Sequence, residues 1–290
     1  MSDQPRYGER RSQPAVACPR HPNLPAISTC KRCGRGTCSD CTIHTEVGSI
    51  CPECANSTTR ARMSRPAYRL QGKSITTWIL GITIAVSLLA TVYKPLQVWL
   101  MYVPAWSMHE PWRLLTVALV HGGLLHLGLN MLTLYIVGNP VEQVLGAGRY
   151  LVLYAASAMG GSLFVLAWGF VDPTSLMGAT VGASGALFGL FAAIFVLQKA
   201  SGSDTTSIVV LLAVNLVYGF VVSGVSWQGH LGGLITGALV AWILVRLARP
   251  RPGKTEKSQT TATVLASVGI FVALLALNYG IYWGLAQFYS

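Results

Sequence analysis

A serine and a histidine that lie far apart in the chain carry the chemistry that the sequence indicates. Ser184 lies in the segment GATVGASGALFG, flanked by Gly182 and Gly185, and His230 lies in QGHLGGLITG. Each segment begins a long apolar run, so we expect both residues near the start of a membrane-spanning helix. A serine there has an uncrowded hydroxyl and nearby free backbone amides. A neutral histidine at the same depth can accept its proton, which is the minimum for nucleophilic acyl transfer.

The segment HGGLLHLGLN could stabilise the negative charge of a tetrahedral intermediate. It contains His121, His126 and Asn130, and the last two are four residues apart, so they share one helix face. Together with the backbone amide of Ser184, His126 and Asn130 could form an oxyanion hole. None of the 10 acidic residues falls in the apolar body of an expected span. The sequence therefore predicts a Ser–His dyad rather than a triad.

Glycine spacing predicts close packing of the two helices that carry the dyad. Gly233 and Gly237 form a small-xxx-small face after His230, which permits close helix approach. Gly189 could supply part of the facing surface. Tight packing of these helices would bring Ser184 and His230 within hydrogen-bond reach.

All seven cysteines lie near the N-terminus and pair at metal-ligand spacing. The pairs are Cys18-x2-His21, Cys30-x2-Cys33, Cys38-x2-Cys41 and Cys51-x2-Cys54. Seven thiols and one histidine suffice for two closed, tetrahedral structural zinc sites, with His44 as a spare candidate. A cytosolic location favours zinc over disulfides. The segment is then either a partner-binding or regulatory module or a small folded cap.

Composition indicates a polytopic membrane protein. Only 11% of the residues are charged, against about a quarter in soluble domains, and the mean hydropathy is +0.50. Stretches long enough to span a bilayer, at about 20 residues each, lie near 75–93, 114–137, 149–170, 181–198, 207–225, 229–247 and 263–286. Segments such as GNPVEQVLGAGR and RPRPGKTEKSQ are expected turns or linkers between them.

Charge distribution predicts the orientation of these spans. If the N-terminus is cytoplasmic, all of the 21 Lys and Arg residues except Lys94 and Arg113 fall on the inner side. The positive-inside rule then places the N-terminus in the cytoplasm and, after seven crossings, the C-terminus outside. Ser184, His230 and His126 would all lie in the outer half of the membrane. The net charge of +11 follows from this topology, so it gives no reason to expect nucleic acid as a partner.

Several other membrane functions fit the sequence less well. No secretory signal peptide is expected, because the first apolar run begins only near Ile75. An aspartyl intramembrane protease needs two carboxylates inside the membrane, and the expected spans contain none. A site-2-type metalloprotease needs an HExxH motif, which this sequence does not contain. A proton-coupled carrier would normally show a buried carboxylate and often a repeat. A channel or transporter therefore remains only an alternative, which a flux assay would expose.

In combination and in order, these motifs resemble the rhomboid family of intramembrane serine proteases over about residues 74–250. The residues that carry the resemblance are Trp112-Arg113, His121, His126-x3-Asn130, Glu142, Gly182-x-Ser184-Gly185 and Gly229-His230-x2-Gly233-x3-Gly237. The resemblance implies Ser184 as nucleophile, His230 as general base, and His126 and Asn130 as oxyanion stabilisers. It assigns supporting roles to His121, Gly182, Gly233, Gly237, Trp112 and Arg113. It also implies transmembrane proteins as substrates, cleaved in or near the outer half of the bilayer.

The resemblance also implies an architecture. We expect an all-α polytopic protein with a rhomboid six-helix core and one C-terminal helix, a 6+1 layout, preceded by a small zinc-binding domain. The expected segments are a disordered N-terminus (1–15), the zinc-binding domain (16–56), a basic linker (57–73), the core (74–250), a cytoplasmic loop (251–262) and the seventh helix with a short outer tail (263–290). A substrate helix would approach near the fifth span, with the VVSGVSWQ loop and its Trp227 as a lid.

The N-terminal cysteine segment resembles a B-box, in which alternate ligand pairs share a metal. That resemblance implies one zinc on Cys18, His21, Cys38 and Cys41, and a second on Cys30, Cys33, Cys51 and Cys54. Segments of this kind resemble those of bacterial rhomboids, which implies a bacterial plasma (inner) membrane. Because both ligand sets are complete, we expect two structural zinc ions and no metal in catalysis. The alternative is a non-catalytic rhomboid-like protein that binds transmembrane helices.

Overall fold

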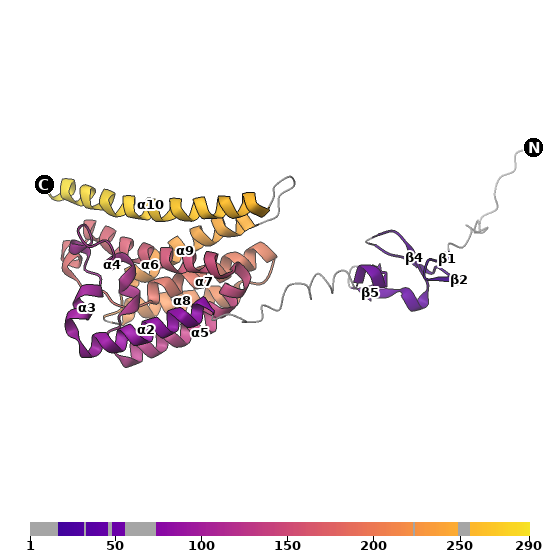
Figure 1. Ribbon diagram of the computed structural model, residues 1–290, viewed down its shortest axis with the longest axis horizontal. Helices are drawn as coiled ribbons and strands as arrows, with labels where there is room; N and C mark the ends of the chain where they lie inside the picture. The colour runs from indigo at the N-terminus through magenta and orange to yellow at the C-terminus, as the bar shows by residue number, and fades with distance from the viewer. Residues whose placement is uncertain (1–16, 32, 46–47, 56–73, 223, 249–255) are drawn as a thin grey trace, which may run out of the picture. The chain divides into compact units, whose positions relative to one another are not determined.

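The computed structural model describes residues 17–31, 33–45, 48–55, 74–222, 224–248 and 256–290 (Figure 1). The chain divides into two compact units, Met1–Gln71 and Gly72–Ser290. The expected disordered N-terminus (1–15) and basic linker (57–73) lie outside the described residues. Each unit has its own fold and its own cluster of chemical groups.

The N-terminal unit consists of three short antiparallel ladders. Strand β1 (Ala17–Cys18) pairs with β2 (His21–Pro25), β3 (Ser28–Thr29) with β4 (Gly36–Thr37), and β5 (Ile43–Thr45) with β6 (Gly48–Ile50), and a 3₁₀ turn, η1 (Ser39–Cys41), follows β4. Its buried residues are mainly cysteines, and Cys18, Cys38 and Cys41 form its core cluster. A unit this small buries little apolar surface, so a metal ion held by its cysteines would add much to its stability.

The second unit is all-α. Its helices are α2 (Ile75–Val92), α3 (Lys94–Leu100), α4 (Arg113–Thr116), α5 (Leu124–Leu145), α6 (Ala147–Ala167), α7 (Ser184–Ser201), α8 (Thr206–Val221), α9 (Trp227–Ala248) and α10 (Glu256–Tyr289). Short 3₁₀ turns η2 (Pro104–Trp106), η3 (Val117–Leu119), η4 (Trp168–Phe170) and η5 (Pro173–Met177) lie between them. Within the described residues, six helices are long and apolar enough to cross a membrane: α2, α5, α6 with η4, α7, α9 and α10.

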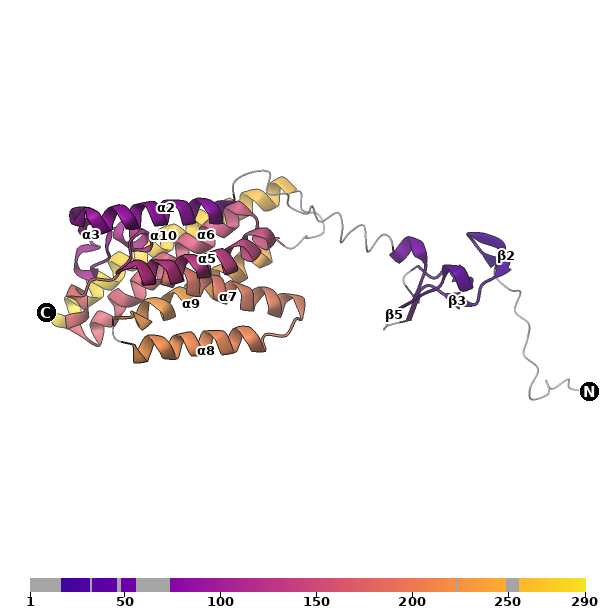
Figure 2. The same cartoon turned by 90° about the horizontal axis from the view of Figure 1, so that it is seen from below.

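The helix α6 lies at the centre of this unit, packed against both α7 and α9 (Figures 1 and 2). In the most apolar 18-residue stretch of α6, 72% of the residues are buried inside the protein, whereas none is buried in the corresponding stretch of α10. Small residues such as Gly160, Gly161 and Ser157 line α6, which lets the neighbouring backbones approach closely. The most buried helix therefore packs against both α7 and α9, which also contact each other directly.

Three expected spans, the second, the fifth and the seventh, differ from the observed helices. The fifth, expected at 207–225, is the 16-residue α8, a shorter apolar helix that lies at the edge of the unit in Figure 2. The second, expected at 114–137, is wrong at both ends, because α5 runs from Leu124 to Leu145. The residues before it form α4, η3 and a bend, so His121 precedes the helix instead of lying in it.

The carboxylate of Glu142 explains why α5 continues past its expected end. The GNPVEQVL segment reads locally as a turn, yet Pro140 lies inside the helix and Gly146, with φ of +80°, ends it. Glu142 is 8% exposed and accepts hydrogen bonds from the Ile75 and Thr76 backbone amides and from the hydroxyls of Ser74 and Thr76. It thereby binds the free amides at the start of α2. The expectation that no carboxylate lies within a span was wrong for this residue.

The C-terminal helix begins earlier than expected. Helix α10 starts at Glu256, so residues 256–262, expected in a loop, belong to the helix. Residues 251–255 of that expected loop lie outside the described part of the chain.

Candidate functional site

Ser184 is the first residue of α7, where the preceding turn presents its hydroxyl at a helix N-terminus. Gly182 has φ of +124°, a conformation that L side chains rarely adopt, and its amide donates to the carbonyl of Val117 at 3.0 Å. The Ala183 amide donates to His121 Nε2 at 3.4 Å. The turn before Ser184 is therefore held at two consecutive backbone amides by the segment that precedes α5.

His121 is a structural support for this turn. Its Nδ1 lies 2.9 Å from Ser87 Oγ, and that hydroxyl donates its own hydrogen to the carbonyl of Leu119 at 2.8 Å. Nδ1 must then carry the hydrogen and donate to Ser87, which leaves Nε2 free to accept from Ala183. His121 is 6% exposed, and both ring nitrogens are used in holding the backbone.

His230 lies in the first turn of α9 and is 7% exposed. Its ring stacks on Phe188, with centroids 4.2 Å apart and an interplanar angle of 16°. Phe188 is one helical turn beyond Ser184, so α7 carries both the hydroxyl and the surface that fixes the imidazole plane. Nδ1 of His230 has no hydrogen-bond partner among the described residues, and a Cβ placed at Gly219 of α8 would lie 3.2 Å from it.

One cavity of about 520 Å³ brings the predicted polar groups together. Ser184, His230, His126 and Asn130 all line it, from α7, α9 and α5. No hydrogen bond joins Ser184 to His230 within the described part of the chain, and such bonds often tighten only when substrate binds. The cavity also reaches Asn215 and Tyr218 of α8 and the segment before α9.

His126 and Asn130 lie on the side of the cavity formed by α5. A Cβ placed at Gly182 would lie 2.8 Å from His126 Cε1 and 3.9 Å from Ser184 Oγ, so this glycine separates the two side chains by little more than its own width. Asn130 is 6% exposed, donates from Nδ2 to the His126 carbonyl at 2.9 Å, and has no partner on Oδ1 among the described residues. His126 therefore lies next to the turn before Ser184, and Asn130 lies one helical turn farther along α5 in the wall of the same cavity.

Glycines set the separation of the helices around the cavity. A Cβ at Gly233 of α9 would lie 2.0 Å from the Gly185 carbonyl oxygen, and one at Gly237 would lie 2.3 Å from Gly189 Cα. Real Cβ atoms do not come so close, so any side chain there would force α7 and α9 apart. The expected small-xxx-small face therefore packs on α7, with Gly189 opposite it.

Trp112 and Arg113 do not line the cavity. Arg113 is 3% exposed and donates from its guanidinium to the carbonyls of Val98 and Met101 and to the carboxylate of Glu110. Trp112 packs against Trp99, with ring centroids 5.7 Å apart. Both residues organise the segment between α2 and α5, so their support for Ser184 is indirect.

Sequence reasoning missed Phe188, Gly161 and the backbone role of Gly229. A Cβ at Gly161 would lie 2.8 Å from the Gly229 carbonyl oxygen and 3.5 Å from Gly185 Cα. One glycine from each of α6, α7 and α9 therefore meets the other two in the wall of the cavity. The signal for Phe188 was its spacing of four residues from Ser184. The signal for Gly161 was the GG pair in an otherwise ordinary apolar run.

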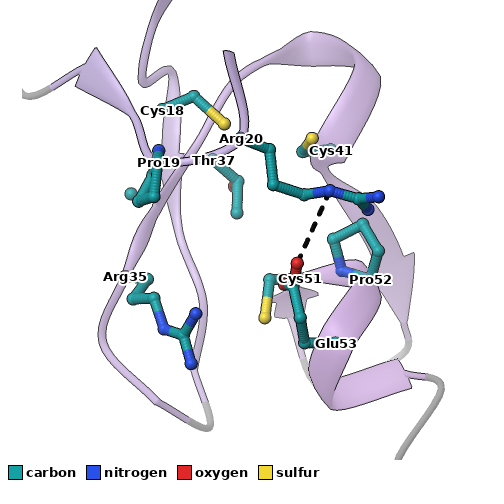
Figure 3. Close-up of a pocket in the computed structure, with 10 residues that line it drawn as sticks. Cys18, Pro19, Arg20, Arg35, Thr37, Cys41, Cys51, Pro52 and Glu53 are labelled. Carbon is teal, nitrogen blue, oxygen red and sulfur yellow. Dashed lines mark ion pairs between the residues drawn. The ribbon is translucent and has the colours of Figure 1, made fainter. Parts of the chain in front are cut away.

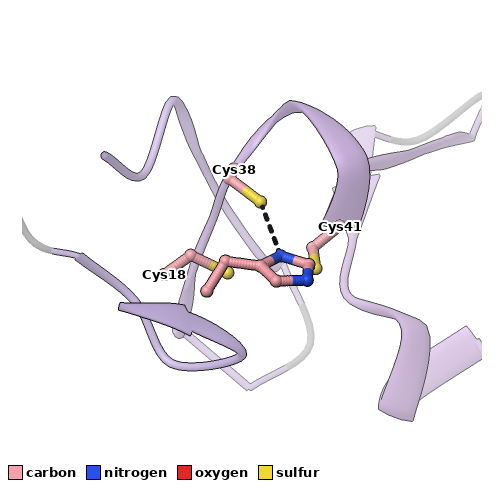
Figure 4. A group of neighbouring side chains, drawn as sticks. Cys18, Cys38 and Cys41 are labelled. Atoms are coloured by element: carbon pink, nitrogen blue, oxygen red, sulfur yellow. Dashed lines mark hydrogen bonds between the residues drawn. The ribbon is translucent and has the colours of Figure 1, made fainter. Parts of the chain in front are cut away.

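The cysteine pairs of the N-terminal unit come together in two groups, in the alternation that the B-box resemblance implies. Cys18, His21, Cys38 and Cys41 form one group, and Cys30, Cys33, Cys51 and Cys54 form the other, with ligand atoms within 4.8 Å of one another in each. Figure 4 shows the thiols of Cys18, Cys38 and Cys41 converging on one point. His44 belongs to neither group and lies 3.5 Å from Ser49 Oγ.

The donor chemistry of both groups fits a soft divalent cation. Hydrogen bonding to Cys51 together with burial raises the pKa of the Cys54 thiol to about 12, and burial raises the pKa of Cys41 to about 11. Backbone hydrogen bonding, mainly at Cys38, lowers the pKa of Cys18 to about 6. Crowded thiols cannot all ionise without a counter-charge, which a bound metal would supply.

The two ligand groups are linked through the chain and through one ion pair. Arg20 and Glu53 pair at 3.5 Å across the small pocket between the groups (Figure 3). Both side chains are largely exposed, so this pair contributes little free energy. The alternation of the ligand pairs is the stronger link, because the loop closed by each group contains one ligand pair of the other.

Comparison with known proteins shows which family the helical unit resembles. Residues 108–247 match the family described as Rhomboid domain. Rhomboid protease GluP of Bacillus subtilis (strain 168) is 35% identical over 161 residues, which are 56% of this chain and 31% of that protein. Putative rhomboid protease YdcA of the same strain is 32% identical over 142 residues, 47% of this chain and 69% of that protein.

A plant relative is similar over a comparable stretch. RHOMBOID-like protein 4 of Arabidopsis thaliana is 38% identical over 147 residues, 50% of this chain and 36% of that protein. The chain thus spans about a third of the length of GluP and of RHOMBOID-like protein 4. The matched residues 108–247 include every group that lines the cavity, whereas α10 and the N-terminal unit lie outside them.

The glycine contact between α7 and α9 can be tested with Gly233→Ala. The added methyl group must push the two helices apart, so we expect the free energy of unfolding to fall by about 1–3 kcal/mol. Denaturant titration in mixed micelles measures this loss. Gly81→Ala in α2 is the matched control, because a Cβ there meets nothing within 4 Å. Equal stability of the two variants would contradict the packing.

Proposed function

The chain belongs to the rhomboid family and is a multi-pass membrane protein, and we propose that it is an intramembrane serine endopeptidase with Ser184 and His230 as its dyad. The observation that carries the proposal is the shared cavity. Four polar side chains from three helices, Ser184, His230, His126 and Asn130, line one space inside the largely apolar helical unit. Polar groups within a membrane domain are costly and usually functional.

The first half of the reaction is acyl transfer to Ser184. Its Oγ attacks the carbonyl carbon of the scissile peptide, while the imidazole of His230 takes the hydroxyl proton. The tetrahedral oxyanion accepts hydrogen bonds from His126, Asn130 and the Ser184 amide. When the C–N bond breaks, His230 returns the proton to the leaving amine, and the acyl-enzyme remains.

The second half is hydrolysis of the acyl-enzyme. A water molecule that enters the cavity gives a proton to His230 and attacks the ester carbonyl, and Ser184 leaves with that proton. The stacking of His230 on Phe188 supports this dyad. It fixes the plane of the imidazole ring, so no acidic residue is needed as a third member to orient it. Among the described residues that line the cavity, none is acidic.

The substrate is proposed to be a transmembrane helix of another protein, cleaved in or near the outer half of the bilayer. Charge distribution supports a cytoplasmic N-terminus and an outer C-terminus, and the match to bacterial relatives supports a bacterial plasma (inner) membrane. In this orientation Ser184 and His230 lie at the outer ends of α7 and α9.

Substrate access is proposed to occur beside α8. This short helix buries only Ile208 and Gly219, and Gly219 covers His230. The end of α8 is held by Trp227, which stacks on Phe220 at 4.5 Å and meets Trp168 edge-on at 4.8 Å. Loosening this aromatic cluster would uncover the cavity from the side.

The two ligand groups of the N-terminal unit are proposed to hold one structural zinc ion each. Three thiols with one imidazole, and four thiols, are the donor sets of closed zinc sites. A bound zinc would supply the counter-charge and the cross-links that the small unit lacks. No metal is proposed for the peptidase reaction. A protein partner for this unit is compatible with its exposed strand β2.

Cleavage of a model transmembrane substrate by the purified protein tests the dyad. We expect Ser184→Ala to lower the cleavage rate at least about 1000-fold, because the nucleophile is lost. Ser201→Ala, at the other end of α7, is the matched control and should cleave like wild type. If folded wild type neither cleaves several substrates nor reacts with a serine-directed fluorophosphonate probe, the chain is instead a rhomboid-like protein that binds transmembrane helices.

Replacement of Trp227 tests access. We expect Trp227→Ala to change the rate by no more than roughly tenfold in either direction, because gating is altered while the reacting groups remain. Initial rates with the same substrate measure the effect, and Trp283→Ala, whose side chain is exposed on α10, serves as control. A folded but inactive Trp227→Ala protein would show that this residue does more than gate.

Metal analysis of the purified full chain tests the zinc proposal. We expect about two zinc ions per chain, and about one in Cys51→Ser, since four-coordinate sites rarely keep a metal on three ligands. His44→Ala should retain both. A wild-type content below one ion per chain, or loss of an ion in His44→Ala, would contradict the ligand assignment.

A further inference from the structure

Helix α10 carries a polar pair on an otherwise apolar surface. Asn278 and Tyr282 are four residues apart and therefore share one helix face. Asn278 is fully buried, although much of α10 is exposed. A buried amide in a membrane helix costs free energy unless it is hydrogen-bonded, so its partners indicate what this helix does.

Those partners belong to the segment between α2 and α5. Asn278 Nδ2 donates to the carbonyl of Ser107 at 3.3 Å, and Ser107 Oγ lies 3.2 Å from Asn278 Oδ1, to which it can donate in return. The Tyr282 hydroxyl donates to the carbonyl of Pro104 and lies 3.3 Å from Ser107 Oγ. These four residues form a closed polar cluster, which we call the clamp.

The clamped segment leads directly to the nucleophile. Tyr102, two residues before Pro104, exchanges two backbone hydrogen bonds with Thr180, at 3.0 and 2.7 Å. Two residues after Thr180 comes Gly182, the positive-φ glycine of the turn before Ser184. Tyr102 is fully buried, so this short ladder is rigidly packed. A shift of the clamped segment would therefore be transmitted to the residues that precede Ser184.

We propose that the clamp makes α10 a positioning element for Ser184: Asn278 and Tyr282 hold the segment between α2 and α5, and through Tyr102 and Thr180 they hold the turn before the nucleophile. The proposal rests on the proposed peptidase function. It assigns a role to a helix that lies outside the matched residues 108–247. The same segment is also anchored to α6 through the Ser162 hydroxyl, which donates to the Leu114 carbonyl at 3.0 Å, whereas Arg113 binds only groups within the segment.

Its position decides what kind of effect the clamp has. None of its residues lines the cavity, so the clamp touches neither substrate nor reacting atoms. Misplacing a nucleophile by a fraction of an ångström lowers the rate of the chemical step far more than it weakens substrate binding. The expected signature is therefore a loss in kcat at nearly constant KM.

Full-length protein carrying Tyr282→Phe or Asn278→Leu tests the proposal. Each variant removes hydrogen bonds but keeps the size of the side chain, and we expect kcat to fall roughly threefold to thirtyfold with KM within about twofold. The second-order rate of fluorophosphonate labelling at Ser184 should fall in parallel. The matched control is Tyr279→Phe, which loses the same hydroxyl from an exposed face of α10 and should behave like wild type.

A double variant tests whether the clamp acts as one unit. Ser107→Ala combined with Asn278→Leu should lower kcat no further than either single change, because both remove the same interaction. Multiplied effects would overturn the proposal, as would kcat values for Tyr282→Phe and Asn278→Leu equal to that of Tyr279→Phe. So would losses of activity that merely follow the fraction of unfolded protein in a thermal melt.

The two proposals fail in distinguishable ways. If wild type and Tyr279→Phe show no cleavage that depends on Ser184, the proposed peptidase function is wrong. The positioning role of the clamp is then wrong as well, because there is no reaction for it to affect. If both cleave but the clamp variants match them in kcat and labelling rate, only the positioning role of α10 is wrong.

Discussion

The close approach of α7 and α9 is the constraint on which the rest of the helical unit depends. Where Gly185 and Gly189 face Gly233 and Gly237, backbone meets backbone and no side chain fits between. Dispersion forces at this distance, and not a hydrophobic effect, hold helices together in lipid. Because Ser184 and His230 lie at the same end of these two helices, the packing that stabilises the fold also sets the distance between the two residues of the proposed dyad.

Around this contact, buried polar groups work as fasteners between segments. His121 ties Ser87 to the turn before Ser184, and Glu142 holds the first residues of α2. In a medium without water each such group must find its partner inside the protein, so a segment that moves leaves unpaired donors behind. The polar network therefore makes the geometry of the cavity specific, whereas the apolar surface only makes the unit compact.

The N-terminal unit follows a different principle of stability. Its strands are two to five residues long and its core cluster is made of thiols, so the ligand pairs must replace the missing apolar core. Their alternation ties together segments that local contacts would leave independent. Both units thus depend on a few short-range contacts between residues distant in sequence, glycines in one and cysteines in the other.

The sequence by itself determined the all-α class of the membrane part, the 6+1 order of apolar segments and the identity of the polar groups. It could do so because the length of each apolar run and the spacing of polar residues within it reflect which residues are kept from water. Motif resemblance also indicated which cysteine pairs would share a site. Only the tertiary structure decided that α5 continues through Pro140 to bind α2 through Glu142, that Phe188 fixes the His230 ring, and that Asn278 and Tyr282 reach Ser107. Each of these depends on a contact between distant segments, and local propensity carries no information about the partner that will be there.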